Sequence, residues 1–305
     1  MAQNDRFYPL VALALSLAAC SGTSAGALTS ARPAGDDAGS EAIVGADAGA
    51  KASADAGSGD GGTGNGHYII VLHADQTPVA VDGATSGETP SDQRIGFSGL
   101  HLFKDASDTS PLVVADLPAP VDVGYNDGDD TVIATVSAKS LSAGHFTVAR
   151  IPIAYVRFTV AGTFHTMTVA APGNFSDVIA MANGTMIDGT TRDQGFWQTA
   201  FSSSGGTTYG MQSGEHAVVA QPGAASGITL DTSKSPSEYV FPTDLDVDPN
   251  LDHDVRVVFH VNTYQDFRWQ DQNVAGYTSG TFDVSAAGFE TVTQLGANSI
   301  STSVE

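Results

Sequence analysis

The residues best suited to chemistry form an acidic run between positions 244 and 254. Oxygen-bearing side chains occupy every second position of this run: Asp244, Asp246, Asp248, Asn250, Asp252 and Asp254. In an extended backbone, residues two positions apart project to the same side. Clustered carboxylates repel one another unless water screens them or a cation neutralises them. Because carboxylate and amide oxygens are the usual ligands of Ca²⁺, the run is a candidate calcium site.

A second acidic segment could complete this site, since three carboxylates stand in a turn-forming stretch: Asp127, Asp129 and Asp130. The opening of the 244–254 run resembles an EF-hand loop. Pro249, however, stands where that loop has an invariant glycine, and Val255 stands where it has a bidentate glutamate. The resemblance therefore implies a looser calcium site, and the alternative is an acidic loop screened only by water.

Other residues suggest other ligands. His165 and Met167 would share one face of a strand and could bind copper, as in the copper-associated sandwich lipoproteins that this chain resembles; the cysteines of that family are missing. Trp197 and Trp269 could form a stacking platform for sugars or peptides if they are exposed. Gly96-Phe97-Ser98-Gly99 lacks the spacing of a nucleophile elbow. Any two of the many acids could act as a glycosidase pair.

The charge of the chain restricts its partners. The formal net charge is −22, from 34 acidic and 12 basic residues. Binding to nucleic acid requires lysine and arginine against the phosphates, so a nucleic-acid partner is excluded. Anionic lipid headgroups are unfavourable for the same reason. Cations, proteins and neutral glycans remain compatible partners.

The N-terminus carries a candidate targeting signal. Residues 7–19 form an apolar run that is shorter than the roughly 20 residues of a membrane-spanning helix, and this length is typical of a signal peptide. The run ends in Leu17-Ala18-Ala19-Cys20, which contains the only cysteine and resembles the lipobox of bacterial lipoproteins. The resemblance implies that residues 1–19 are removed, that Cys20 is lipidated, and that the anchor lies in the outer membrane or at the cell surface. The alternative is a secreted protein with a free thiol.

The composition then divides the mature chain. Residues 20–66 are rich in Ala, Gly, Asp and Ser without apolar periodicity, which predicts a disordered tether. Residues 67–305 alternate β-branched and aromatic runs with Gly, Pro, Asn and Asp, which predicts an all-β antiparallel β-sandwich, either prealbumin-like or immunoglobulin-like. This domain could consist of two subdomains divided near residues 170–195. With one cysteine, no internal disulfide can stabilise it.

Strands are predicted over these ranges: 67–73, 95–103, 113–117, 131–136, 145–160, 163–170, 196–201, 216–220, 255–262 and 281–284. Residues 176–181 are the best candidate for a short helix. Within 145–160 the apolar side changes near Arg150 and changes back by Val156, which predicts a bulge or bend at Pro152. The run should therefore cross between sheets or be two strands.

The entry to this run carries a second resemblance. Leu141, Gly144, Phe146 and Val148 follow the Leu-x-x-Gly-x-aromatic-x-aliphatic signature of transthyretin-like sandwich domains. The resemblance implies that Leu141 plugs one end of the sandwich and that Phe146 begins an inward face. It implies a fold and no function. From the residues we expect a non-catalytic binding or structural module with protein or glycan partners, with a surface glycan hydrolase or a copper-handling protein as alternatives.

Overall fold

The fold is built almost entirely from β-strands, seen in a computed structural model that describes residues 64–206, 208–215, 222, 227–285 and 288–305. All of these residues belong to one unit, Ala52–Glu305. The predicted signal peptide, Cys20 and nearly all of the predicted tether lie outside the described residues, as does the predicted strand 216–220. One 3₁₀ turn, Ala138–Ser140, is present among the described residues.

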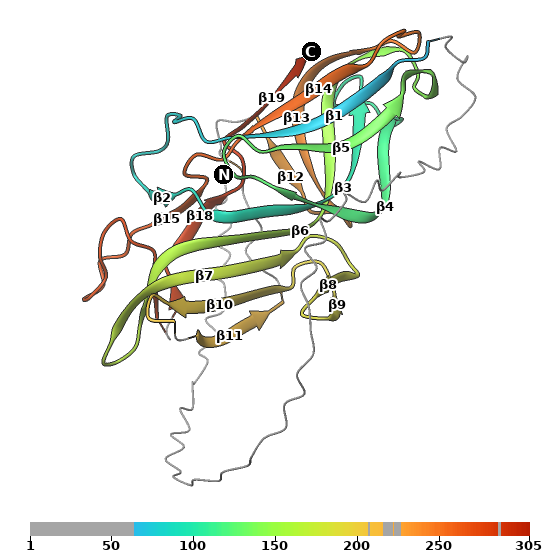
Figure 1. Cartoon of the computed structure of the whole chain (residues 1–305). Coiled ribbons are helices and arrows are strands. Elements are labelled where there is room, and N and C mark those ends of the chain that lie inside the picture. Colours follow the sequence, from blue (N-terminus) through green and yellow to red (C-terminus); the bar gives the residue numbers. More distant parts are fainter. Residues whose placement is uncertain (1–63, 207, 216–221, 223–226, 286–287) are drawn as a thin grey trace, which may run out of the picture. The chain divides into compact units, whose positions relative to one another are not determined.

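The first sheet has the strand order β19-β14-β1-β5 (Figure 1). Its strands are β1 His67–Asp75, β5 Asp130–Ser137, β14 Val255–Asn262 and β19 Ser299–Val304. β1 lies at the centre, parallel to β14 and antiparallel to β5. Its residues Tyr68, Ile70, Leu72 and Ala74 are buried in the core, which gives the two-residue period of a strand with an inward face.

The second sheet is larger and contains the order β11-β10-β7-β6-β13-β12, with β3, β4, β16 and β17 attached to the side of this path. Its strands are β3 Ser91–Phe103, β4 Leu112–Gly124, β6 Gly144–His165, β7 Ala170–Ala180, β10 Trp197–Ser203, β11 Thr208–Gly214, β12 Thr229–Asp231, β13 Ser237–Val247, β16 Asp283–Ser285 and β17 Gly288–Phe289. Figure 1 shows β7, β10 and β11 side by side next to β6. Its pairs are antiparallel, except that β16 pairs parallel with β6.

Two small sheets complete the described part of the chain. The first contains β2 Ser86–Glu88, β15 Phe267–Gln270 and β18 Thr291–Leu295, and the second contains β8 Thr185–Ile187 and β9 Thr190–Arg192. One hydrophobic cluster joins side chains of the first sheet to those of the second. The ring of Phe241 on β13 contacts that of Phe259 on β14, with centroids 5.7 Å apart and planes at 83°. The predicted all-β antiparallel sandwich is confirmed.

β6 is the longest strand and resolves the alternatives left open for its sequence. Ala149, Ile151 and Ile153 are buried, and then Val156, Phe158 and Val160 are buried. The inward side therefore changes within the run, as predicted. β6 nevertheless stays one strand of one sheet, because its edge changes partner at this point: Ile153 pairs with β13 and Tyr155 pairs with β7.

Two local predictions are wrong. Residues 176–181 do not form a helix, because most of this segment continues β7, which pairs with β6 on one side and β10 on the other. Residues 163–170 are not one strand, because a turn over residues 166–169 separates β6 from β7, with Thr166 N donating to Val169 O at 2.8 Å. At the entry to β6, Leu141 and Phe146 are both buried in the core. β7, which lies within the range suggested for a subdomain division, pairs with β6 before it and with β10 after it.

Candidate functional site

The acidic run begins on β13, and we call its exposed first carboxylates, Asp244 and Asp246, the acidic edge. Asp244 and Asp246 point to solvent with side chains 91% and 87% exposed, while the intervening Leu245 and the following Val247 are buried. The imidazole of His145 lies beside both carboxylates, with its Nδ1 2.9 Å from Asp246 Oδ1 and 3.8 Å from Asp244 Oδ1. This edge is strongly solvated, so water screens much of its charge.

The remaining residues of the run lie in the loop between β13 and β14 and bind local partners. Asp248 Oδ1 accepts hydrogen bonds from Asn250 N at 2.8 Å and Asn250 Nδ2 at 3.3 Å. A hydrogen bond with His253 lowers the pKa of the Asp252 carboxyl, and a hydrogen bond with His67 lowers that of Asp254. Within the described part of the chain, no three His, Cys, Asp or Glu side chains form a group able to hold a metal ion.

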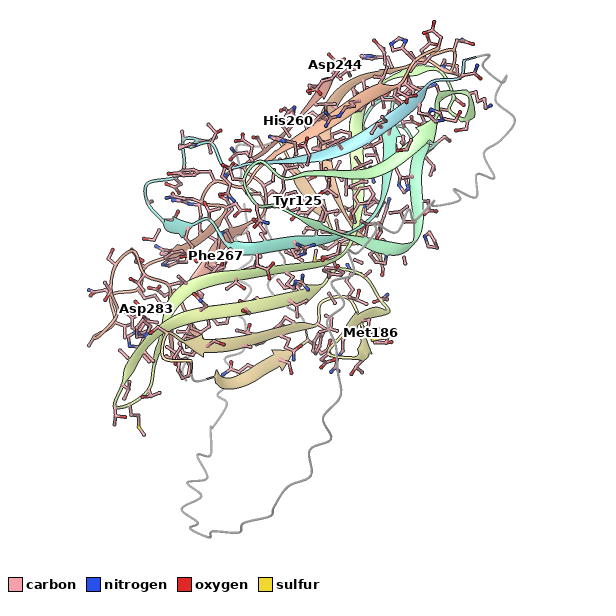
Figure 2. All side chains as sticks on the ribbon, viewed as in Figure 1. Tyr125, Met186, Asp244, His260, Phe267 and Asp283 are labelled. Atoms are coloured by element: carbon pink, nitrogen blue, oxygen red, sulfur yellow. The ribbon has the colours of Figure 1, made fainter. Side chains whose placement is uncertain are left out.

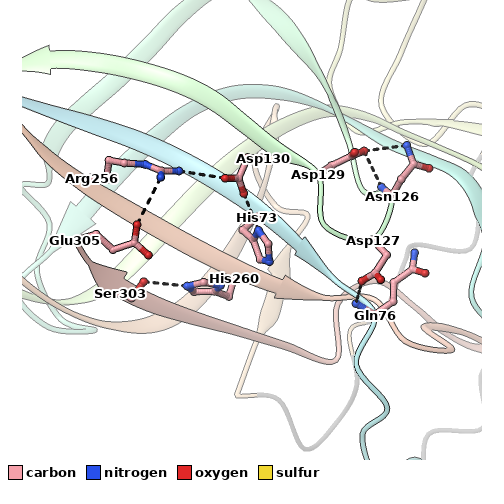
Figure 3. A network of polar contacts seen from close by, with 10 residues as sticks. All are labelled: His73, Gln76, Asn126, Asp127, Asp129, Asp130, Arg256, His260, Ser303 and Glu305. Carbon is pink, nitrogen blue, oxygen red and sulfur yellow. Dashed lines mark hydrogen bonds and ion pairs between the residues drawn. The ribbon is translucent and has the colours of Figure 1, made fainter.

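The turn that was expected to complete this site forms a network of its own (Figure 3). Asp127 Oδ1 accepts from Gln76 N at 2.9 Å, and Asp129 Oδ2 accepts from Asn126 N at 3.1 Å. Asp130 Oδ1 lies 2.6 Å from His73 Nδ1, and Asp130 Oδ2 lies 3.1 Å from Arg256 Nη2. These two hydrogen bonds lower the pKa of Asp130, and the one from His73 has the larger effect.

The structure does not bring the two acidic segments together. Asp127 is bound beside the end of β1, where Gln76 follows the strand, whereas Asp254 is bound to His67 at its beginning. A strand rises about 3.3 Å per residue, so the length of β1 separates them by more than about 20 Å. Asp127, Asp129 and Asp130 therefore add no ligands to the 244–254 run.

The structure does not place the two candidate copper ligands, His165 and Met167, on one strand face. His165 is the last residue of β6, and its Nε2 lies 2.6 Å from Oδ1 of the buried Asp283. The His165 ring also stacks on Tyr277, with centroids 4.9 Å apart. Met167 lies in the following turn with a fully exposed side chain. The strand that was expected to present both donors ends before Met167.

The two tryptophans occupy different environments. Trp269 is 1% exposed and packs against Phe267 and Phe282, with centroids 5.7 Å and 5.5 Å away. The expectation that it contacts a ligand is wrong, because no ligand can reach a ring inside the core. Trp197 is partly buried against the same core, and its indole lies so close to Gly214 that a Cβ there would meet Nε1 at 2.8 Å.

A pocket of about 550 Å³ opens between β3, β4, β6 and β13, and sequence reasoning missed it. Its polar lining includes His101, Asp116, Tyr155, Lys234 and Glu238. Much of the remaining wall is proline: Pro118, Pro120, Pro152 and Pro236. Such volumes and mixed linings are usual for small-molecule sites. Proline walls are also rigid, because the ring locks φ.

Two loops close one side of this pocket, and hydrogen bonds hold them in place. Asn183 N donates to Ser235 Oγ at 2.7 Å, which joins the loop before β8 to the loop before β13. Thr185 Oγ1 donates to Ala154 O at 2.9 Å and to Ala182 O at 2.7 Å, which fastens the first loop to β6. Met186 marks this end of the domain in Figure 2, far from Asp244 and from Asp283. The pocket is thus separate from both the acidic edge and the His165–Asp283 pair.

Glu238 is the principal charged group of the pocket. It is 7% exposed, and its Oε2 lies 3.1 Å from Arg150 Nη1 and 3.2 Å from Lys234 Nζ. Arg150 also stacks on Phe103, with its guanidinium carbon 4.6 Å from the ring centroid, and its Nε has no hydrogen-bond partner. The carboxylate is therefore held between two cations, and Asp116, which also lines the pocket, brings the formal charge of these four groups to zero.

His101 and Tyr155 complete the titratable lining. Burial lowers the pKa of His101, and the negative charges of Glu238 and Asp116 oppose this effect. A neutral imidazole is therefore favoured, and it can both donate and accept a hydrogen bond. Burial, together with the hydrogen bond from Tyr155 Oη to Asp122 Oδ1 at 2.8 Å, raises the pKa of Tyr155 to about 12. The pocket thus combines two neutral hydrogen-bonding groups, His101 and Tyr155, with charged groups whose formal charges balance.

A weak sequence signal for this pocket did exist. Arg150 interrupts an apolar strand, and Glu238 stands directly before the apolar Tyr239-Val240-Phe241. Charged residues at such positions are seldom buried without a partner, so the two could have been paired across strands. Nothing in the spacing, however, brings residue 150 to residue 238, because only the β6–β13 pairing does so.

Within the described residues, no helix has the length and apolarity needed to cross a bilayer. No protein-family model, no curated protein and no solved structure matches this chain.

Proposed function

We propose that this chain is a lipid-anchored protein of the bacterial outer membrane or cell surface, and that its β domain is a non-catalytic binding module whose ligand occupies the Glu238 pocket. The Leu17-Ala18-Ala19-Cys20 tetrad supports the anchor. The observation that carries the binding role is the buried Glu238, held by Arg150 and Lys234 at a pocket of about 550 Å³. Such charged groups are costly to bury, which favours a role in recognition.

The chemistry of the lining favours a neutral, hydroxyl-rich ligand, and we identify the ligand class as a glycan. Because Glu238 and Asp116 together balance the charges of Arg150 and Lys234, the site gains little from a net charge on the ligand. Its carboxylate, imidazole and ammonium groups can still bind hydroxyls, as charged partners strengthen hydrogen bonds. Tyr155 and the prolines supply apolar walls for the faces of a sugar ring. A protein loop carrying similar groups would be the other partner class.

Glu238→Gln should weaken glycan binding about tenfold or more, because hydrogen bonds to charged groups contribute about 1.5–3 kcal/mol. The measurement is calorimetric titration of the full chain with neutral oligosaccharides first selected on a glycan array. Asp244→Asn is the matched control, since Asp244 is exposed and distant from the pocket (Figure 2), and it should bind as the parent does. Absence of any binding by the parent chain, or equal affinity for Glu238→Gln, would contradict the proposal.

Glycoside hydrolysis is the second candidate function, because one observation favours it. Asp116 and Glu238 both line the pocket, and the charges of both act on His101. Paired carboxylates are the catalytic groups of most glycosidases. The test is release of nitrophenol from aryl glycosides. If the parent chain has this activity and both Asp116→Asn and Glu238→Gln lose it, the protein is a glycoside hydrolase and the non-catalytic binding role is wrong.

Calcium stabilisation stays a prediction for the acidic edge. We expect Ca²⁺ to raise the melting temperature by about 3 °C or more over the value in chelator, as a native-state ligand does by mass action. The double variant Asp244→Asn with Asp246→Asn should lose this response and keep its fold, since both side chains are exposed. Equal melting temperatures with calcium and with chelator would contradict calcium stabilisation.

A further inference from the structure

A group of three buried polar side chains, which we call the chamber, lies where β3 meets the turn between β14 and β15. Three side chains of this chamber are almost fully buried: Gln93 is 5% exposed, Thr263 1% and Asp266 0%. Gln93 comes from β3, and the other two come from the turn whose middle residues are Tyr264 and Gln265. Gln93 Nε2 donates to Asp266 Oδ2 at 2.7 Å. The chamber thus joins two segments that are far apart in the sequence.

Three oxygens of the chamber lack a hydrogen-bond partner, namely Gln93 Oε1, Thr263 Oγ1 and Asp266 Oδ1. Buried polar atoms are nearly always partnered, by protein, water or an ion. Thr263 and Asp266 are the first and fourth residues of one turn, whose ends lie within about 7 Å of each other, and Gln93 is hydrogen-bonded to Asp266. The three side chains therefore come from two neighbouring segments, and two of the three oxygens are pure acceptors.

The charge of the chamber is unbalanced. No lysine, arginine or histidine of the described residues forms an ion pair with Asp266. The ionisable groups whose charge acts with that of Asp266 are Tyr125 and Tyr239, and burial raises the pKa of both hydroxyls, so they stay neutral at ordinary pH. A buried carboxylate without a countercharge is unfavourable. One positive charge would balance it, whereas a divalent ion would leave an excess charge in a low-dielectric interior.

The backbone on both sides of the chamber is held in an uncommon conformation. Asp92, beside Gln93, has φ of 50°, and Gln265, beside Asp266, has φ of 47°. Non-glycine residues seldom adopt this region, and they do so where surrounding structure requires it. We infer that Gln93 Oε1, Thr263 Oγ1 and Asp266 Oδ1 bind a monovalent cation, Na⁺ in the first place. Amide, hydroxyl and carboxylate oxygens are the hard ligands that such an ion takes.

Melting of the full chain in sodium chloride against choline chloride tests this site, at equal ionic strength, with chelator present and at pH 8. Choline is much larger than Na⁺ and its charge is covered by methyl groups, so the melting temperature should be about 3 °C or more higher in sodium. Asp266→Asn, which removes the charge, should melt alike in both salts.

Asp92→Asn is the matched control, because it removes an exposed carboxylate next to Gln93 without entering the chamber. It should keep the full sodium response. Equal melting of the parent chain in sodium and choline at pH 8 would overturn the site and assign the chamber to water or a proton. A response to Ca²⁺ without chelator, with none to Na⁺, would overturn the charge-balance argument. The parent-chain comparison decides the matter even if Asp266→Asn fails to fold.

Discussion

Replacing Cys20 with serine should abolish lipid attachment completely. A thiol is the acyl acceptor in a lipobox, and Cys20 is the only cysteine in the chain, so no other thiol can take its place. The measurement is metabolic labelling with a palmitate analogue, followed by fractionation of membranes from soluble protein. We expect the label to vanish and the protein to leave the membrane fraction, because each buried CH₂ of an acyl chain contributes about 0.8 kcal/mol to anchoring.

The conservative control for this experiment is Ser21→Ala, which follows the cysteine and should keep both label and membrane association. The mass of the mature protein gives a second, independent reading, since cleavage before Cys20 with acylation predicts a defined N-terminal peptide. A mature protein whose Cys20 reacts freely with a maleimide would show that the leader belongs to an ordinary secreted protein. The proposed anchor would then be wrong, whereas the Glu238 pocket would be unaffected.

Trp269→Ala should lower the free energy of unfolding by about 3–5 kcal/mol, as usual for removing a fully buried aromatic ring. Trp269 is 1% exposed and contacts Phe267 and Phe282, and its Nε1 donates to Asp271 Oδ1 at 3.1 Å. With no internal disulfide in the fold, core packing carries most of the stability. Urea denaturation followed by circular dichroism measures the change.

Two further variants make this result specific. Trp269→Phe keeps a ring in the core and loses the hydrogen bond to Asp271, so we expect a smaller loss. Trp197→Ala should also lose less than Trp269→Ala, since Trp197 is only partly buried. If Trp269→Ala unfolded within about 1 kcal/mol of the parent, the ring would not be the core element described here.

The strands were largely predictable because their signal is local. A two-residue alternation of apolar and polar side chains marks β1, β3 and β14 wherever one face is buried. The change of inward side within β6 was readable for the same reason. Residues 176–181 were misread because Asp177 stands in the strand, where Thr199 Oγ1 donates to its carboxylate and burial raises its pKa to about 6. That cross-strand partner is invisible in the local pattern.

The chemical sites were less predictable, because they depend on contacts between distant residues. Spacing placed Asp244 and Asp246 on one side of a strand, yet it could not show that β1 separates Asp127 from Asp254. Residue type made Trp269 a candidate for ligand binding, and only packing placed it in the core. Arg150 and Glu238 are 88 positions apart, so their pairing needed the register of β6 with β13.

By itself, the sequence determined the all-β class, most strand positions, the strongly negative charge and the absence of any internal disulfide, since all of these follow from composition and local periodicity. The tertiary structure alone decided which acids meet, which tryptophan is buried, and where a pocket and a buried polar chamber form. The physical reason is that pairing register and burial are set by long-range packing, and a charged or aromatic side chain has its chemistry changed by whatever that packing places beside it.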